Sequence, residues 1–218
     1  MTPAPPPPRL YLITGRHQTA GRPLSGVIGQ ALAAVRSGRI PADAVAVQLR
    51  EKDLSGRDLF ALAAPLRAVT RAAGVRLFIN DRVDVALAAG ADGVHLGGGA
   101  LEREDVAAIA PDLAVAVSTH SLAEVEALRG DPRVSFALFG PVHETPSKQA
   151  FGPPLGLDAL RSASALGVPL LAVGGVDAAN ARACVDAGAS GVALIRAVLS
   201  DGAPDRALSA IFEAIEST

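Results

Sequence analysis

The sequence predicts a single-domain α/β fold, a TIM (β/α)8 barrel, from three observations. Short apolar runs recur along the chain, at residues 10–14, 44–50, 75–80, 93–96, 114–119, 136–142, 169–175 and 191–195. Several are apolar throughout, as is typical of strands buried on both faces of a parallel sheet. Helical patterns separate these runs, and polar residues follow nearly every one of them. Active sites of such barrels lie at these carboxyl ends of the strands.

About eight β/α units fit into roughly 200 residues, which is the lower end for this barrel. An open doubly wound sheet is the alternative, but it rarely needs eight units. The helix at residues 55–74 has Ser55 as its expected N-cap, and the helix at residues 121–130 has Ser121, with Glu124 completing a capping box. Asp177 is a further expected cap, for a helix that Gly188 would end.

The expected division of the chain is a disordered Pro-rich arm at residues 1–8 and a barrel domain at residues 9–218. The arm, MTPAPPPP, lacks the charged and apolar regions of a signal peptide. Its prolines cannot continue the hydrogen bonding of a helix or a sheet.

Composition excludes several classes of partner. The net charge is −2 and aromatic residues make up 3% of the chain, so neither a basic surface nor stacking platforms point to nucleic acid. No apolar run approaches about 18 residues, so no membrane span is expected. The single cysteine, Cys184, is expected to be a packed core thiol, which fits a reducing cytoplasm. The oligomeric state, including a homo-oligomer, stays open.

The segment Gln48-Leu49-Arg50-Glu51-Lys52 predicts an anion site. Alternation along a strand sends Gln48, Arg50 and Lys52 to one face, which is the barrel mouth if the residues between them pack outward. A guanidinium, an amide and an ammonium together suit a polyphosphate or a carboxylate. The alternative is a solvated strand end with a Glu51–Lys52 surface pair.

Asn80 and Asp81 follow the third apolar run. Together they could hold a cation and a phosphate oxygen, or Asp81 could be the N-cap of the helix that begins after it. Both interpretations stay open on the local sequence.

Glycines after the seventh run, Gly174 and Gly175, allow close approach of a phosphate to the backbone. Ile195 and Arg196 follow the eighth run, and the loops after strands 7 and 8 commonly bind phosphate in this fold. Arg196 either adds a charge there or points to solvent.

The longest expected loop, residues 143–157, carries Thr145, Ser147 and Lys148, which suit an anion-gripping lid or an exposed polar loop. His120 lies beside Ser118 after the fifth run and is a candidate acid or base. His95 is expected to be a packed residue that is hydrogen-bonded to backbone. No spacing of histidines, cysteines and carboxylates suggests zinc.

These strand ends together resemble the thiamine-phosphate synthase and TenI-type thiazole tautomerase family. The matching stretches cover nearly the whole chain after the arm, in order: VQLREKDLS, FINDRVDVALAAGADGVHLG, VSTHSLAEVEAL, FALFGPVHETPSKQAFGPPLGL, LLAVGGV and GVALIRAV. The resemblance implies a TIM barrel acting on a phosphorylated thiazole and a pyrimidine pyrophosphate. In the synthase the pyrimidine pyrophosphate ionises with the help of Mg2+, and the thiazole nitrogen captures the cation.

The resemblance also implies roles for individual residues. Pyrophosphate contacts fall to Gln48, Arg50, Lys52, Asn80 and Lys148. Magnesium falls to Asp81. Further substrate-binding positions are Ser118, Thr145, Ser147, Gly174, Gly175, Ile195 and Arg196, and the residues that match catalytic positions are Arg50, Lys52, His120 and Lys148.

The stretch VHLGGGALERED departs from the synthase pattern. A Gln and a second magnesium-binding Asp stand in that pattern where this chain has Gly98 and Ala100, and a Ser stands where it has Arg196. These departures resemble the tautomerase branch, an isomerase that needs no metal and uses a histidine matching His120. The expected function is the synthase, with the tautomerase as the alternative and a non-catalytic thiazole-phosphate binder as the third hypothesis. Glu102, Glu104 and Asp105 could replace the missing metal ligand, but their position in a first helical turn favours a role facing the helix dipole. The role of the arm stays open.

Overall fold

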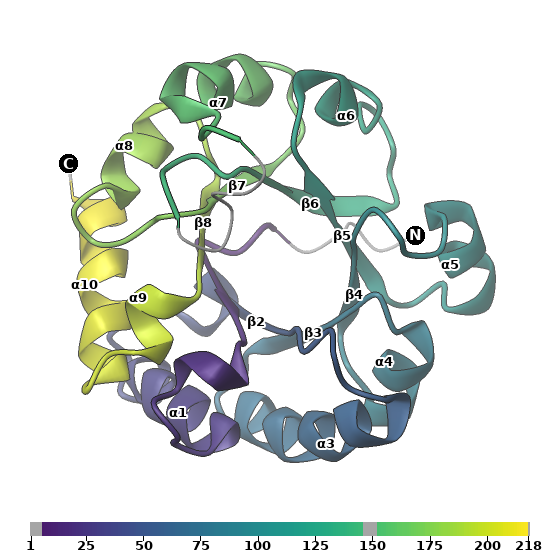
Figure 1. The fold of residues 1–218 in the computed structure, drawn as a ribbon, viewed down its shortest axis with the longest axis vertical. Coiled ribbons are helices and arrows are strands. Elements are labelled where there is room, and N and C mark those ends of the chain that lie inside the picture. Colours follow the sequence, from purple (N-terminus) through teal and green to yellow (C-terminus); the bar gives the residue numbers. More distant parts are fainter. Residues whose placement is uncertain (1–5, 146–151, 218) are drawn as a thin grey trace.

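The protein is described by a computed structural model covering residues 6–145 and 152–217. Eight parallel strands form one closed barrel in which each strand pairs with its neighbours in chain order and the last pairs with the first (Figure 1). The strands are β1 Leu10–Ile13, β2 Val45–Leu49, β3 Arg76–Asn80, β4 Gly93–Leu96, β5 Ala114–Thr119, β6 Val134–Phe139, β7 Leu170–Val173 and β8 Gly191–Leu194. The predicted TIM barrel is therefore confirmed.

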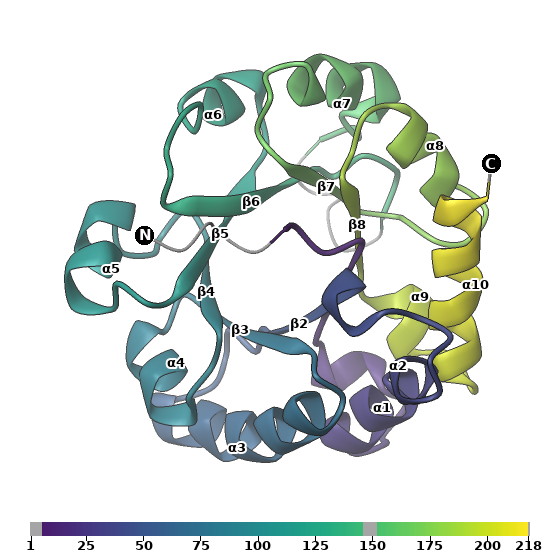
Figure 2. The same ribbon diagram turned by 180° about the vertical axis from the view of Figure 1, so that it is seen from behind.

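Helices surround this barrel on its outside (Figures 1 and 2). They are α1 Leu24–Ala31, α2 Ala33–Arg36, α3 Gly56–Ala72, α4 Val83–Ala89, α5 Arg103–Ile109, α6 Leu122–Glu126, α7 Gly156–Ser164, α8 Ala181–Asp186, α9 Arg196–Leu199 and α10 Pro204–Glu216. Short 3-10 helices, η1 Arg16–Gln18 and η2 Ala42–Ala44, follow β1 and precede β2. Among the residues described, none of these helices combines the length and apolar character that a membrane crossing requires.

Two apolar layers stabilise the barrel, and strand alternation assigns residues to them. Val47 and Leu49 of β2 point outward and belong to the large core between the strands and the helices. Inside the barrel, Tyr11, Phe78 and Phe136 pack edge to face, with Tyr11 and Phe136 ring centroids 5.1 Å apart. Such aromatic packing fills the barrel axis with apolar surface and leaves the polar side chains at its carboxyl end.

The predicted helix starts are partly confirmed. Ser55 Oγ accepts a hydrogen bond from Asp58 N, and Ser121 Oγ accepts one from Glu124 N, both at 3.2 Å. The second bond of the expected capping box goes elsewhere, because Glu124 Oε2 accepts from the backbone N of His120 at 2.6 Å rather than from that of Ser121.

Asp177 does not cap α8. Its carboxylate accepts from Ala179 N within a tight turn, and the helix begins four residues later, at Ala181 with Asn180 in the N-cap position. Gly188 lies just beyond the end of α8 with a φ of +98°, as expected of a residue that ends a helix. Cys184 of α8 is buried in the core, which confirms the packed thiol, and burial raises its pKa to about 11.

Both ends of the described chain lie at the amino-terminal end of the barrel. Arg9, directly before β1, donates from Nε to Glu216 Oε1 of α10 at 2.8 Å. Arg76 Nη2 donates to the carbonyl oxygen of Pro6 at 2.8 Å, and Pro8 is buried. Figure 2 shows this segment before β1 crossing the end of the barrel that is turned away in Figure 1. Residues 1–5 lie outside the described residues, so disorder stays a prediction for them, whereas Pro6 and Pro8 of the expected arm lie against the barrel.

Candidate active site

Two side-chain amides and one carboxylate form a chain across the ends of β2 and β3. Gln48 Nε2 donates to Asn80 Oδ1 at 3.2 Å, and Asn80 Nδ2 donates to Asp81 Oδ2 at 2.7 Å. Because a carboxylate only accepts hydrogen bonds, Asp81 fixes the orientation of both amides. The buried Gln48 Oε1 then has no hydrogen-bond donor among the described residues. It is a buried acceptor that a donor from a ligand or from water would satisfy.

Asp81 joins the end of β3 to the glycine-rich loop after β4. Its Oδ1 accepts from Gly97 N at 2.7 Å, and its own backbone N donates to the carbonyl oxygen of His95 at 2.9 Å. The φ of Asp81 is +59°, a left-handed conformation that aspartate tolerates better than most residues. The N-cap position of α4 belongs to Arg82, so the interpretation of Asp81 as a helix cap is wrong.

Arg50 and Lys52 follow β2 at the same end of the barrel. Within the described part of the chain neither forms an ion pair with a carboxylate. Both positive charges act on the interior of the barrel. Burial is the largest cause of the lowered pKa of His95, and the charges of Arg50 and Lys52 lower it further. Gln48 points to the same mouth, since its neighbours Val47 and Leu49 pack outward. The described structure thus places these cations and amides at the same end of the barrel, and their binding of an anion stays a prediction.

The expected surface pair between Glu51 and Lys52 is wrong. Glu51 is buried, and its carboxylate accepts from Thr14 Oγ1 at 2.9 Å and from Arg16 Nη1 at 3.1 Å. Thr14 and Arg16 were not among the site residues expected from the sequence. The alternation that sends Gln48 and Arg50 to the mouth also sends Glu51 to the other face. The sequence therefore already indicated that Glu51 points away from the mouth.

His95 lies inside the barrel between two hydroxyl groups. Its Nδ1 is 3.4 Å from Tyr11 Oη and its Nε2 is 2.8 Å from Ser118 Oγ. Burial is the main cause that lowers the pKa of His95 to about 3, so the ring is neutral at physiological pH. The expected burial is confirmed, but the partners of the ring are side chains rather than backbone. Through this contact the ring fixes Ser118 at the end of β5.

His120 is exposed at the mouth, just after β5. Its Nδ1 lies 2.6 Å from the carbonyl oxygen of Gly140, so Nδ1 carries the proton and donates. Nε2 is then the basic nitrogen in the neutral ring. This tautomer is suited to accepting a proton from a ligand.

Arg196 bridges the loop after β6 and the end of β8. Its Nη2 donates to Thr145 Oγ1 at 3.2 Å, although the arginine itself is exposed. Thr145 is buried, and a cavity of about 400 Å³ lies beside it between the loops after β6 and before α7. Ser147 and Lys148 lie outside the described residues, so the predicted anion-gripping lid stays a prediction.

The turn after β7 requires glycine at two positions. Gly174 and Gly175 have φ values of +97° and +65°. A Cβ on Gly175 would lie 2.4 Å from the carbonyl oxygen of Glu144, and Asn180 Nδ2 donates to the carbonyl oxygen of Gly175 at 2.9 Å. The turn therefore packs closely on the loop after β6, next to Ile195 and Arg196 at the end of β8.

Replacing Gly175 with alanine is expected to lower the free energy of unfolding by more than the ~1–2 kcal/mol that a left-handed residue alone costs. Gly38→Ala is the matched control, because Gly38 has a φ of +75° but its added Cβ would meet no atom within 4 Å among the described residues. Urea denaturation of both variants separates the conformational cost from the contact. Equal losses would contradict the close packing against Glu144.

Carboxylates do not cluster as a metal cage in the described residues. Among them, no group of three His, Cys, Asp or Glu side chains has a metal-binding arrangement. Glu104 and Asp105 lie in the first turn of α5, with Glu102 at its N-cap position, and Glu104 pairs with Arg133 at 2.6 Å. The expected place in the first turn is confirmed for Glu104 and Asp105, whereas Glu102 lies one position before the helix. Gly98 and Ala100 stand in the loop between β4 and α5, beyond the Gly97 that Asp81 holds.

Comparisons with known proteins point to one family. A family model described as thiamine monophosphate synthase matches residues 10–198. The thiamine-phosphate synthase of Roseiflexus castenholzii is 45% identical over 201 residues, covering 90% of this chain and 82% of that protein. The thiamine-phosphate synthase of Roseiflexus sp. is 39% identical over 210 residues, covering 95% and 85%.

Solved structures lead to the same family. The thiamine phosphate pyrophosphorylase from Pyrococcus furiosus superposes with a TM-score of 0.82 at 31% identity, covering 95% of each chain. The orotidine 5'-phosphate decarboxylase from Pyrococcus horikoshii shares the fold alone, with a TM-score of 0.65 at 15% identity. The resemblance found in the sequence is confirmed, and this chain belongs to the thiamine monophosphate synthase family.

Proposed function

We propose that this protein is a thiamine-phosphate synthase, a transferase that joins hydroxymethylpyrimidine pyrophosphate to thiazole phosphate and releases pyrophosphate. The observation that carries the proposal is the grouping of Arg50 and Lys52 with the Gln48–Asn80–Asp81 chain at one end of the barrel. Two cations without carboxylate partners in the described structure suit a polyphosphate. The relatives named as thiamine-phosphate synthases support the same reaction.

The reaction breaks the bond between the pyrimidine methylene carbon and the pyrophosphate oxygen. Both electrons of that bond leave with the oxygen, so negative charge grows on the pyrophosphate as the carbon becomes cationic. Arg50 and Lys52 would stabilise that charge as it develops, because both lie at this end of the barrel without a carboxylate partner among the described residues. The thiazole nitrogen then forms the new bond to the methylene carbon with its lone pair. Lys148 is proposed to contact the same pyrophosphate.

The residues at the end of β3 fit Mg2+, which is bound in many phosphate sites by one or two carboxylates together with substrate oxygens. Asp81 Oδ1 accepts from Gly97 N and Oδ2 accepts from Asn80 Nδ2, and each oxygen has a second lone pair for a cation. Asp81 would hold the ion as the protein carboxylate, and Asn80 keeps that carboxylate oriented. Bound Mg2+ would neutralise part of the charge on the leaving pyrophosphate.

The thiazole phosphate is proposed to lie at the ends of β7 and β8. Gly174 and Gly175 bring backbone close to that position, while Ile195 and Arg196 follow β8. Arg196 is held by Thr145, and its guanidinium supplies charge where the synthase pattern has a serine. Ser118, fixed by His95, and Ser147 are proposed as further substrate contacts.

The tautomerase is the second candidate, and two observations favour it. Ala100 provides no metal ligand in the loop after β4, and the neutral ring of His120 presents Nε2 as a base. That reaction moves a proton within a thiazole carboxylate phosphate and needs no pyrophosphate clamp. Arg50 and Lys52 therefore favour the synthase.

An assay of each reaction, the second with thiazole carboxylate phosphate as substrate, separates the two candidates. Purified protein, hydroxymethylpyrimidine pyrophosphate, thiazole phosphate and Mg2+ are expected to yield thiamine phosphate and pyrophosphate in equal amounts, with EDTA abolishing both. Chromatography measures the products. No product at saturating substrates would overturn the synthase, and metal-independent isomerisation lost in His120→Ala would establish the tautomerase instead.

A further inference from the structure

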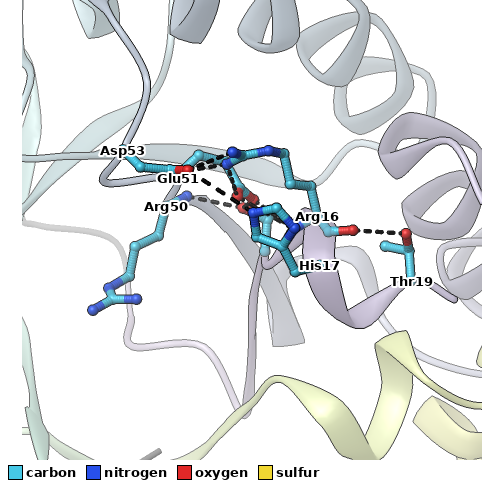
Figure 3. Close-up of polar contacts among 7 residues, drawn as sticks. Arg16, His17, Thr19, Arg50, Glu51 and Asp53 are labelled. Atoms are coloured by element: carbon cyan, nitrogen blue, oxygen red, sulfur yellow. Dashed lines mark hydrogen bonds and ion pairs between the residues drawn. The ribbon is translucent and has the colours of Figure 1, made fainter. Parts of the chain in front are cut away.

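A cluster of four side chains lies behind the proposed pyrophosphate site, on the side of β2 that faces β1 and η1. We call Thr14, Arg16, Glu51 and Asp53 the counter-charge cluster, and Figure 3 labels its three charged members. Arg16 Nη1 contacts Glu51 Oε2 at 3.1 Å and Asp53 Oδ1 at 2.7 Å, and the backbone N of Arg16 donates to Glu51 Oε1 at 3.0 Å. One guanidinium thus binds both acids of the segment Arg50-Glu51-Lys52-Asp53.

The charges of this segment alternate along the chain, and the structure separates them by sign. Figure 3 shows the side chain of Arg50 pointing away from Arg16 and its two carboxylates. Glu51 is buried, while Asp53 is exposed and lies one residue after Lys52. Without Arg16, Glu51 and Asp53 would have no guanidinium to neutralise them, and both are next to Arg50 and Lys52 in the sequence. They would then compete with an anionic ligand for those two side chains.

The cluster also reaches the backbone of Arg50. Thr14 Oγ1 donates to Glu51 Oε1 at 2.9 Å, and the same oxygen of Thr14 accepts from the backbone N of Arg50 at 2.9 Å. A shift of Glu51 would therefore displace Thr14 and, through it, the backbone of Arg50. The hydrogen bond with Arg16 also holds the pKa of Asp53 well below its usual range.

We propose that Arg16 is a positioning residue for pyrophosphate binding: by holding Glu51 and Asp53 on the outer side of β2, it keeps Arg50 and Lys52 available to the anion. The inference rests on the proposed function, since it requires the pyrophosphate to bind these two cations. Arg16 itself does not touch the ligand. Its role is electrostatic. Removing a negative charge that it neutralises should therefore compensate for the loss of Arg16.

The test is the binding of inorganic pyrophosphate in magnesium buffer, measured by calorimetry. Arg16→Gln is expected to weaken binding about tenfold at low salt, and the double variant Arg16→Gln/Asp53→Asn is expected to recover much of that loss. The difference should shrink at high salt, because the added carboxylate charge is exposed. A merely structural defect would not be repaired by changing Asp53.

Arg129→Gln is the matched control, since Arg129 forms an exposed pair with Glu126 at 2.8 Å, before β6 and away from the mouth.

A second variant, Arg16→Lys, serves as a control against loss of folding. Arg16→Lys keeps the charge near Glu51 but cannot pair with both carboxylates as a planar fork does, and it should give intermediate affinity that Asp53→Asn again improves. Affinity equal to wild type in the folded Arg16 variants, or no recovery in the double variants, would overturn the inference alone. If wild type fails to bind pyrophosphate and forms no thiamine phosphate, the proposed function fails and the inference falls with it.

Discussion

Replacing Arg50 with alanine is expected to lower kcat/KM for hydroxymethylpyrimidine pyrophosphate by about 10²–10³-fold, the usual cost of removing one preorganised group that stabilises transition-state charge. Arg50 lies at the end of β2, and within the described residues no carboxylate pairs with it. Its backbone is fixed by Thr14, so the guanidinium begins from a defined position. The charge that it stabilises is largest when the carbon–oxygen bond is breaking, so kcat should fall as well as affinity.

Steady-state kinetics with varied pyrimidine pyrophosphate measures this effect. Arg50→Lys should retain more activity than Arg50→Ala, because it keeps the charge while losing the planar fork. Arg129→Ala, at the other end of the barrel, should leave kcat/KM unchanged. An Arg50→Ala enzyme with wild-type kcat would mean that the pyrophosphate leaves from another part of the mouth.

The second large effect is expected at Asp81. Asp81→Asn should lower the rate about 100-fold or more at physiological Mg2+ and raise the Mg2+ concentration that gives half-maximal rate. The amide keeps an oxygen for Gly97 N but removes the negative charge, and its own NH2 group would face the NH2 group of Asn80 if it kept the present orientation. Both consequences weaken the proposed metal ligand.

Magnesium titrations of the rate test this prediction. Asp84→Asn is the matched control, because Asp84 lies three residues later, is exposed and pairs with Arg82 rather than with the mouth. Its Mg2+ dependence should equal that of wild type. If Asp81→Asn also keeps the wild-type Mg2+ dependence, another carboxylate holds the ion or none is needed.

Much of the barrel could be predicted from the sequence because its strands are continuous apolar runs. The sixth run shows the limit of that signal: the strand is Val134–Phe139, whereas the apolar pattern continues to Val142. After Phe139, the backbone N of Gly140 donates to Thr119 of β5, whereas that of Val142 donates to Val173 of β7, so the apolar character of this segment serves loop packing. The length of an apolar run alone does not show where the strand ends and the packed loop begins.

The candidate site divides in the same way. Strand alternation placed Gln48 correctly toward the mouth, because side chains of successive residues point to opposite faces. The partner of Glu51 was not predictable locally, since Arg16 and Thr14 are more than 30 residues away and meet it only when β1 pairs with β2. His95 was expected to be packed, but its side-chain partners come from β1 and β5, which local sequence does not bring together.

The ion pair between Arg9 and Glu216 has a practical consequence for attaching the enzyme to other molecules. It holds the start of β1 and the end of α10 together at one pole of the barrel, whereas Arg50, Asp81 and His120 follow the opposite ends of their strands. A surface, a resin or a fused protein attached beside Arg9 or Glu216 would therefore approach from the amino-terminal end of the barrel. Substrates would still enter from the solvent side, and tethering would orient every molecule with its mouth outward.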